Sequence, residues 1–456
     1  MINNEFLGTE KVGKLLFSLA IPTITAQLIN VLYNIVDRMY ISRIKDVGTI
    51  ALTGVGVSIP VILIISAFAA LITSGATPKA SIAMGQKDND KAEKILGNSF
   101  ILLIFISCII TTTLLLFKDN ILILFGASES ALPYASDYIG IYAIGTIFVQ
   151  LTLGLNAFIT SQGFTKVSMR TIMIGAIANI ILDPIFIFSF NLGVKGAALA
   201  TIISQALSCI YVLKFLTGNK TVLKLKKENL KLDLKLILPC VALGVAPFIM
   251  QSTESAVILS FNTSLYNFGG DIAVASMTIL TSAMQFSMLP LLGLLQGSQP
   301  IISYNYGAKN SQRVRQCFRY LLSSAMIYSF TYWLFVMLFP DIFSKIFTPD
   351  INLVNYTISP LRVYMSATCI IGIQMACQMT LVSLGYATSS IFLAILRKII
   401  LLIPLIYILP HLISNKVMAV FIAEPIADVL AVITTATIFL IQYKKANKFM
   451  DNKSKA

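Results

Sequence analysis

Asp183 is the residue whose type and position most strongly suggest chemistry in this chain. It is the only ionisable residue between residues 172 and 190, a stretch long and apolar enough to cross most of a lipid bilayer. Asn179 lies four residues earlier, on the same helical face, and its amide can donate a hydrogen bond or coordinate an ion. Pro184 follows at once and removes a backbone donor, which kinks helices. These features predict a cation or proton site, with a buried Asp that only joins two helices as the alternative.

A second carboxylate, Asp37, is expected to lie near Asp183. The first and fifth predicted spans run in the same direction, and counting about 1.5 Å per residue puts both carboxylates in the outer half of the membrane. Thr201 of the sixth span falls at a similar depth. Two carboxylates in a poorly solvated pocket disfavour each other's ionised forms, so we expect the pair to bind a proton or Na⁺. Asn179 and Thr201 would supply neutral oxygens to such an ion.

The second half of the chain carries its own ionisable residues within apolar segments. Glu254, near the middle of the seventh predicted span, is a candidate to bind a cationic substrate, with a polar contact between helices as the equal alternative. Arg397 and Lys398 either reach the membrane surface or line a cleft. Flexible methionine and glutamine side chains also recur at helical spacing, which suits a promiscuous pocket, although packing is their commoner role. These residues are Met284, Gln285, Met288, Gln374 and Gln378.

The composition indicates a membrane protein with many spans. Of its 456 residues 57% are hydrophobic and only 12% are charged, against about 25% charged in soluble domains. One histidine and six cysteines without paired spacing predict neither a metal centre nor another cofactor. No cluster of His, Cys and Ser suits an enzyme. The net charge of +14 does not indicate nucleic-acid binding, because lysine and arginine concentrate in alternate loops, as membrane topology requires.

Hydropathy predicts about twelve membrane spans. They are expected near residues 15–42, 49–76, 95–117, 133–160, 168–190, 194–217, 236–265, 272–299, 320–339, 356–384, 388–410 and 417–443. The loops rich in lysine and arginine fall on the same side as both ends of the chain. We therefore expect a multi-pass protein of the plasma membrane with both termini in the cytoplasm.

The two halves of the chain repeat each other. Residues 75–78, Gly85 and Gly163 match residues 297–300, Gly307 and Gly385, each at an offset of 222. We interpret residues 1–217 as an N-lobe, 218–235 as a cytoplasmic loop between lobes, and 236–456 as a C-lobe with a basic cytoplasmic tail. An even number of spans in each half predicts a pseudo-twofold axis along the membrane normal. Two such bundles can rock against each other.

The repeat also exposes an asymmetry. Aligning the halves places Asn262 opposite Asp37 and Ile403 opposite Asp183, so only the first half has the two carboxylates. If these carboxylates only held a bundle together, we see no reason for one bundle alone to need them. The asymmetry therefore favours an ion site over a structural contact.

Several of these motifs resemble the multidrug and toxin extrusion (MATE) family, in particular its Gram-positive multidrug-efflux branch. The most specific are residues 33–38, 51–56, 85–97, 162–163 and 179–184, and the resemblance extends over about residues 8–445. It implies an all-α membrane protein with twelve transmembrane helices in two pseudo-twofold-related six-helix lobes around a central cleft. It also implies cation-coupled export of amphipathic organic cations by alternating access.

The resemblance also implies roles for specific residues. In the family, an acidic site in the first lobe controls bending of the first helix and drug release. The positions matching that site here are Asp37, Asn179, Asp183 and Thr201. Those matching positions implicated in drug contact or the hydrogen-bond network are Asn30, Tyr33 and Asn156. Some relatives instead use acidic residues of the second lobe, for which Glu254 is the matching residue here.

The sequence is thus interpreted as a multidrug antiporter coupled to H⁺ or Na⁺, without enzymatic activity and without a cofactor other than the coupling ion. The expected partners are small amphipathic cationic drugs or dyes and the lipid bilayer, with no nucleic acid, and we expect a monomer. A lipid-linked precursor flippase of the same superfamily is the alternative. Such flippases often have two extra helices and a strongly basic cleft, whereas this chain has twelve predicted spans and carboxylates in its first half.

Overall fold

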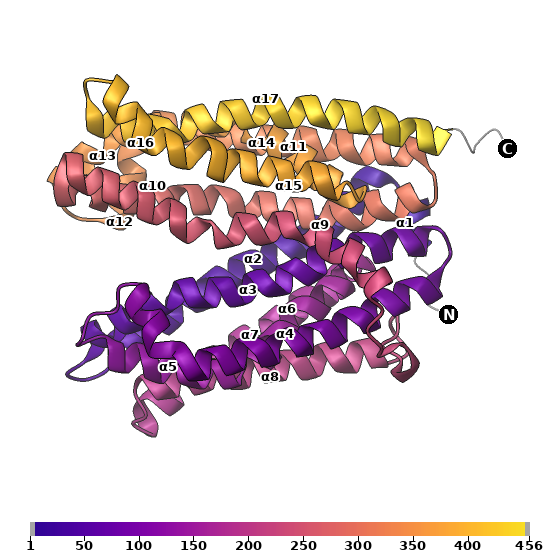
Figure 1. Ribbon diagram of the computed structural model, residues 1–456, viewed down its shortest axis with the longest axis horizontal. Helices are drawn as coiled ribbons and strands as arrows, with labels where there is room; N and C mark the ends of the chain where they lie inside the picture. Colours follow the sequence, from indigo (N-terminus) through magenta and orange to yellow (C-terminus); the bar gives the residue numbers. More distant parts are fainter. Residues whose placement is uncertain (1–4, 452–456) are drawn as a thin grey trace.

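The computed structural model covers residues 5–451, which fold almost entirely into helices. Helices α2 to α8 form a first bundle, and helices α9 to α17 form a second bundle. Figure 1 shows the two bundles meeting at the end that carries α1 and the end of α17, and separating toward the other end. The prediction of an all-α membrane protein built from two bundles is confirmed.

Long helices make up both bundles. The first bundle contains α2 (Val12–Ser42), α3 (Gly48–Gly85), α4 (Asn89–Leu124), α5 (Leu132–Ile144), α6 (Thr146–Ser161), α7 (Thr165–Pro184), the π-helical turn η1 (Ile185–Ser189) and α8 (Val194–Thr217). The second bundle contains α9 (Leu234–Ser252), α10 (Glu254–Gly307), α11 (Ser311–Leu338), α12 (Pro340–Phe347), α13 (Ile351–Tyr364), α14 (Thr368–Ser383), α15 (Ala387–Ile395), the π-helical segment η3 (Leu396–Leu402), α16 (Ile403–Leu412) and α17 (Lys416–Asp451).

The described helices account for the predicted membrane crossings. Nine segments of residues 5–451 are long and apolar enough to span a bilayer, and the bent pairs α5–α6 and α13–α14 raise the number to 11. One of the nine, Leu234–Gly307, is 74 residues long, which at about 1.5 Å per residue far exceeds a single crossing. It is interrupted at Gly270, where φ is 65° and ψ is −160°, between the seventh and eighth predicted spans. Counted as two crossings, this segment brings the number to the predicted twelve.

Two predicted spans are bent rather than continuous. The fourth span bends by 58° between α5 and α6, and the tenth bends by 47° between α13 and α14. At the first bend the Thr146 hydroxyl donates to the carbonyl of Tyr142, 3.3 Å away. Threonine side chains that bond back to the preceding turn bend helices. Hydropathy does not reveal such a bend, because both arms are equally apolar.

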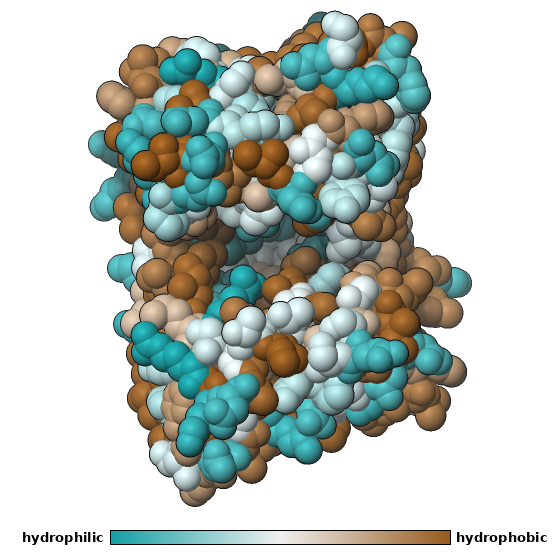
Figure 2. Space-filling model, turned by 90° about the vertical axis from the view of Figure 1, so that its left-hand side faces the viewer, coloured by the Kyte–Doolittle hydropathy of each residue, from teal (hydrophilic) through white to brown (hydrophobic). Residues whose placement is uncertain are grey.

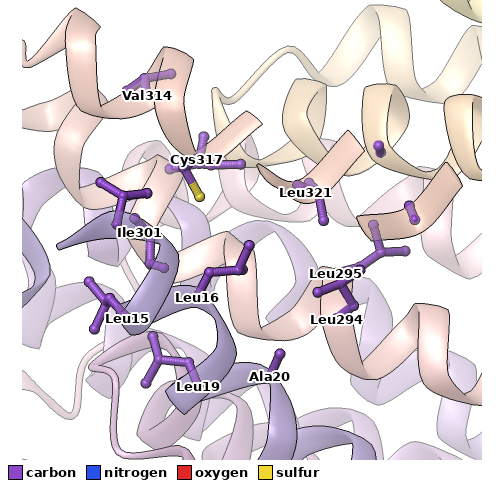
Figure 3. Packing of buried hydrophobic residues seen from close by; sticks show 14 of the residues in the cluster. Leu15, Leu16, Leu19, Ala20, Leu294, Leu295, Ile301, Val314, Cys317 and Leu321 are labelled. Atoms are coloured by element: carbon purple, nitrogen blue, oxygen red, sulfur yellow. The ribbon is translucent and has the colours of Figure 1, made fainter. Parts of the chain in front are cut away.

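The two bundles share a hydrophobic core at the end where they meet. Figure 3 shows leucines of α2 pointing toward residues of α10 and α11. The labelled members are Leu15, Leu16, Leu19, Ala20, Leu294, Leu295, Ile301, Val314, Cys317 and Leu321. Burying one leucine side chain contributes about 1.5–3 kcal/mol where water is the alternative. Because α2 supplies part of this core, it ties the first bundle to the second.

The short helix α1 (Phe6–Thr9) crosses to the second bundle although it precedes α2. Leu7 is fully buried in the shared core, and its carbonyl accepts hydrogen bonds from Asn305 Nδ2 at 2.9 Å and Arg313 Nη2 at 3.0 Å. Phe6 lies against Gly163 of the first bundle. The segment therefore contacts both bundles where they meet.

A cleft separates the bundles at the opposite end of the molecule. Figure 2, which looks onto that end, shows the hollow between two masses of surface side chains. Hydrogen bonds between bundles lie toward the closed end. Gln27 Nε2 of α2 donates to Gln296 Oε1 of α10 at 3.3 Å, and Gln299 Nε2 of α10 donates to Thr77 Oγ1 of α3 at 3.0 Å. In this structure the molecule is open at one end only.

Candidate functional site

Asp37, Asn179 and Asp183 come together inside the first bundle. Asn179 Nδ2 donates to Asp183 Oδ1 at 3.1 Å, and the carboxyl group of Asp37 lies beside that of Asp183. The three residues are 8%, 2% and 0% exposed for Asp37, Asn179 and Asp183, respectively. Two adjoining carboxyl groups can form a hydrogen bond only if one of them carries a proton. The sequence predicted this grouping, and the residues present suit a shared proton or a cation.

Three buried oxygen atoms in this group of side chains have no hydrogen-bond partner among residues 5–451. They are Asp37 Oδ1, Asp183 Oδ2 and Asn179 Oδ1. Buried polar atoms are normally paired, so three unpaired oxygens at one place need an explanation. Carboxylate and amide oxygens are ligands for hard cations. The residues present therefore fit either a proton or a small cation such as Na⁺.

Thr201 lies beside this group, but its hydroxyl is already engaged. Thr201 Oγ1 donates to the carbonyl of Ala197 at 3.0 Å, and the hydroxyl of Tyr138 lies beside the Thr201 side chain. Its second lone pair leaves it a neutral acceptor. Thr201 therefore borders the site through Tyr138 and has no recorded bond to either carboxylate.

A group of tyrosines encloses Asp37. Tyr33, one turn earlier on α2, and Tyr138 on α5 both lie in the electrostatic field of Asp37. The Tyr138 and Tyr142 rings stack with centroids 6.1 Å apart. Sequence analysis missed Tyr138 and Tyr142. Their spacing of four residues puts them on one face of a predicted span, but nothing in the sequence places that face near Asp37.

The elements around the site explain its position. Helix α7 ends at Pro184, and the chain continues as the π-helical turn η1, so the backbone is loosened immediately after Asp183, as predicted. Helix α2, which carries Asp37, packs against α7 on one side and α10 of the second bundle on the other. Asp37 is thus carried by a helix that both bundles touch.

The residues predicted to contact substrate are spread over several places. Asn30 is exposed on α2, whereas Asn156 is buried on α6 and donates to the carbonyl of Ser168 at 3.4 Å. In the second bundle, Gln378 Nε2 donates to Met250 Sδ at 3.3 Å, and Gln374 is buried with its Oε1 unpaired among the described residues. On α10, Met284 and Met288 pack against hydrophobic core while Gln285 is exposed. Within residues 5–451, the contacts described above do not join these side chains into one group.

Glu254 belongs to a cluster of charged side chains inside the second bundle. The members of this charge cluster are Glu254, Arg397, Lys398, Glu424 and Asp428. Arg397 Nη2 lies 2.6 Å from Asp428 Oδ1 and 3.3 Å from Glu424 Oε1, and Lys398 Nζ pairs with Glu254 Oε2. Arg397 and Lys398 thus point into the bundle and not to the membrane surface. Sequence analysis singled out Glu254, Arg397 and Lys398 but did not predict how they pair.

The match to a known protein family also falls into two parts, one in each half of the chain. The family model MatE matches residues 22–185 and again residues 245–408, which agrees with the internal repeat. The multidrug export protein MepA of Staphylococcus aureus is 26% identical over 424 residues, covering 92% of this chain and 93% of MepA. MepA of Staphylococcus haemolyticus is 26% identical over 428 residues, covering 93% and 94%.

Solved structures confirm the fold. A crystal structure titled as MATE in the bent conformation superposes with a TM-score of 0.92 at 22% identity, covering 98% of this chain and 99% of the other. A structure titled as the outward-facing conformation of a multidrug resistance MATE family transporter gives a TM-score of 0.91 with the same identity and coverage. At this level of identity, the likeness establishes the shared architecture.

Proposed function

Because the chain belongs to the MatE family of membrane transporters, we propose that it exports amphipathic organic cations by alternating access, coupled to H⁺ or Na⁺. Multidrug export is the printed function of the MepA relatives, which cover nearly the whole chain. The observation that carries the proposal is the buried pair Asp37 and Asp183 with Asn179, located beside the helix that links the bundles.

Coupling follows from how the pair responds to its ion. With neither proton nor cation bound, two adjoining carboxylates repel in a poorly solvated site, and α2 and α7 are pushed apart at that level. Binding of H⁺ or Na⁺ removes this repulsion and favours the closer packing. A ligand can shift a conformational equilibrium only through such differential binding. Ion entry thereby disfavours the drug-loaded, outward-open state and favours drug release.

We further propose a location, an oligomeric state, an orientation and a preferred substrate charge. The protein resides in the plasma membrane as a monomer, with both termini in the cytoplasm, so the cleft at the end opposite the termini opens outward. A low-dielectric cleft beside carboxylates favours positively charged substrates. Anionic dyes should therefore be poor substrates.

Everted membrane vesicles from cells that overproduce the chain test this proposal. Ethidium accumulation is followed by fluorescence while a pH gradient (acidic inside) and a Na⁺ gradient (high inside) are imposed separately. One gradient should drive accumulation above that of vesicles from cells with an empty vector. Equal accumulation in both preparations under either gradient would contradict cation-coupled export of this substrate class.

A further inference from the structure

The charge cluster of the second bundle contains one more carboxylate than it has cations. Arg397 and Lys398 face Glu254, Glu424 and Asp428. Charged side chains within a membrane domain are costly, so an unequal number needs an explanation. Aligning Pro184 with Pro404 places uncharged Ile177 and Ala178 opposite the two cations, so the arrangement is confined to the second bundle.

The two ion pairs of the cluster differ in exposure. Around Arg397 the side chains are 11% exposed for the arginine, 7% for Glu424 and 2% for Asp428, which makes this triad part of the interior. In the other pair, Lys398 is 10% exposed but Glu254 is 43% exposed. Only Glu254 is therefore accessible to a ligand.

The carboxylate of Glu254 pairs with Lys398 of the second bundle, while 43% of the Glu254 side chain remains exposed. Met250, just before the break between α9 and α10, contacts the buried Gln378 of the second bundle. Phe248, six residues before Glu254, contacts Phe68 of the first bundle, with ring centroids 5.2 Å apart. Glu254 therefore follows a stretch of α9 that contacts both bundles.

Lys398 has a second carboxylate within its electrostatic reach. Arg397 makes its shorter contacts with Asp428, at 2.6 and 2.8 Å, and a longer one of 3.3 Å with Glu424. Glu424 is thus in contact with the residue that immediately precedes Lys398 on η3. A lysine ammonium is a compact charge on a flexible stem and can change partners, which a bidentate arginine does less readily.

We propose that Lys398 is a resident cation of the second bundle that moves from Glu254 to Glu424 when a cationic substrate binds Glu254. The proposal rests on the proposed export of organic cations. The positive charge of the substrate replaces the Lys398 ammonium at Glu254. The Lys398 ammonium then neutralises Glu424, so the buried carboxylates are paired with cations in both states. Lys398 thereby sets the affinity for monovalent organic cations, and its return to Glu254 expels the substrate.

Ethidium affinity of the purified full-length protein tests this exchange. Equilibrium dissociation constants are measured by fluorescence anisotropy for wild type, Lys398→Met, Glu424→Gln and the double variant. Lys398→Met should bind ethidium more tightly, by about threefold or more, because the competing cation is gone. Glu424→Gln should weaken binding by a similar factor although Glu424 does not touch substrate, because Lys398 then remains on Glu254. In the Lys398→Met background, Glu424→Gln should have no effect.

Further variants distinguish exchange from a structural role. Lys398→Arg should stay close to wild type, because it preserves the charge. In a Glu254→Gln background, Glu424→Gln should be silent, which provides a second test if Lys398→Met does not fold. Weaker binding by a folded Lys398→Met variant, or an effect of Glu424→Gln that persists without Lys398 or Glu254, would overturn the exchange. Absence of ethidium binding by the wild type would instead contradict the proposed function.

Discussion

Asp183 makes two side-chain contacts, one with Asn179 and one with Asp37. The first fixes the carboxyl group through a donated hydrogen bond, and the second creates the need for a proton or cation. These two contacts have different consequences. Loss of the Asn179 contact leaves a buried acceptor unpaired, whereas loss of the second charge removes the reason to bind an ion. Single substitutions can therefore distinguish a contact that maintains the structure from a contact that binds the coupling ion.

Tyr138 offers the first residue-scale prediction. Tyr138→Phe removes the hydroxyl that lies beside Thr201 and keeps the ring that stacks on Tyr142. We expect a loss of about 0.5–1.5 kcal/mol in stability and slower gradient-driven ethidium transport, because the wall of the ion site loses a donor. Initial transport rates in proteoliposomes and thermal unfolding check this. Tyr142→Phe is the matched control, and an equal loss of transport in both variants would contradict a specific role for Tyr138.

Part of the site could be predicted from the sequence. The rest could not, because it depends on contacts between residues that are far apart in the sequence. Asp37 and Asp183 stand out because charge within an apolar span is rare, and Asn179 follows from helical spacing. Tyr138 does not stand out, because tyrosine is common in membrane helices and its partner Thr201 lies on another helix. The pairing of Lys398 with Glu254 spans 144 residues and depends on the packing of α9 against α15. Such partners emerge only from tertiary structure.

At the scale of elements, the segment between the bundles is fixed to the first bundle by buried polar side chains. Gln162 Oε1 accepts from Thr221 Oγ1 at 2.8 Å and from the backbone amides of Val222 and Leu223, both at 2.9 Å. Glu93 lies 2.6 Å from Lys226, and this hydrogen bond raises the pKa of Lys226 above its ordinary value. A connection rich in lysine would otherwise be free to move.

Gln162→Leu should release this segment. Three hydrogen bonds lose their acceptor at once, at a local cost of about 1–3 kcal/mol for each group left unpaired. Limited trypsin digestion should then cut faster after the exposed Lys226 and Lys227 than in wild type. Gln86→Leu, at an exposed position of the same end, is the control. Equal digestion rates for wild type and Gln162→Leu would show that Gln162 does not hold the segment.

The elements themselves were largely predictable. Every predicted span corresponds to a helix or a bent helix pair, because about 20 consecutive apolar residues leave the chain few alternatives in a membrane. Apart from the loosened backbone at Pro184, breaks inside spans were not predicted. The change from α9 to α10 at Thr253 and the π-helical segment η3 each involve a few residues within a long predicted span, so hydropathy averaged over the span gives no signal for them.

For the whole molecule, the repeat determines how the bundles meet. A Cβ on Gly85 would lie 1.9 Å from the carbonyl oxygen of Tyr304, and one on Gly307 would lie 2.0 Å from that of Ile82. These two contacts are related by the same offset of 222 that relates the halves of the chain. The repeated glycines therefore mark the place where α3 and α10 approach each other across the pseudo-twofold axis.

Alanine at either glycine should prevent this close approach. Gly85→Ala and Gly307→Ala should each destabilise the closed end by about 1–3 kcal/mol, and by similar amounts because the contacts are equivalent. Thermal unfolding measures the loss, and labelling of a cysteine introduced at Gln27 reports opening of that end. Gly56→Ala is the control, since a Cβ there meets nothing within 4 Å. Unchanged stability and labelling in both glycine variants would contradict the assignment of these contacts as the closed end.

The central claim is that Asp183 carries the coupling ion. Asp183→Asn keeps the size of the side chain and an oxygen that can accept from Asn179, but its amide cannot change protonation state. The same purified variant, reconstituted in proteoliposomes, is measured for ethidium exchange without a gradient and for ethidium accumulation driven by a pH or Na⁺ gradient. We predict that exchange persists and gradient-driven accumulation is lost. Full gradient-driven accumulation by Asp183→Asn would contradict the account.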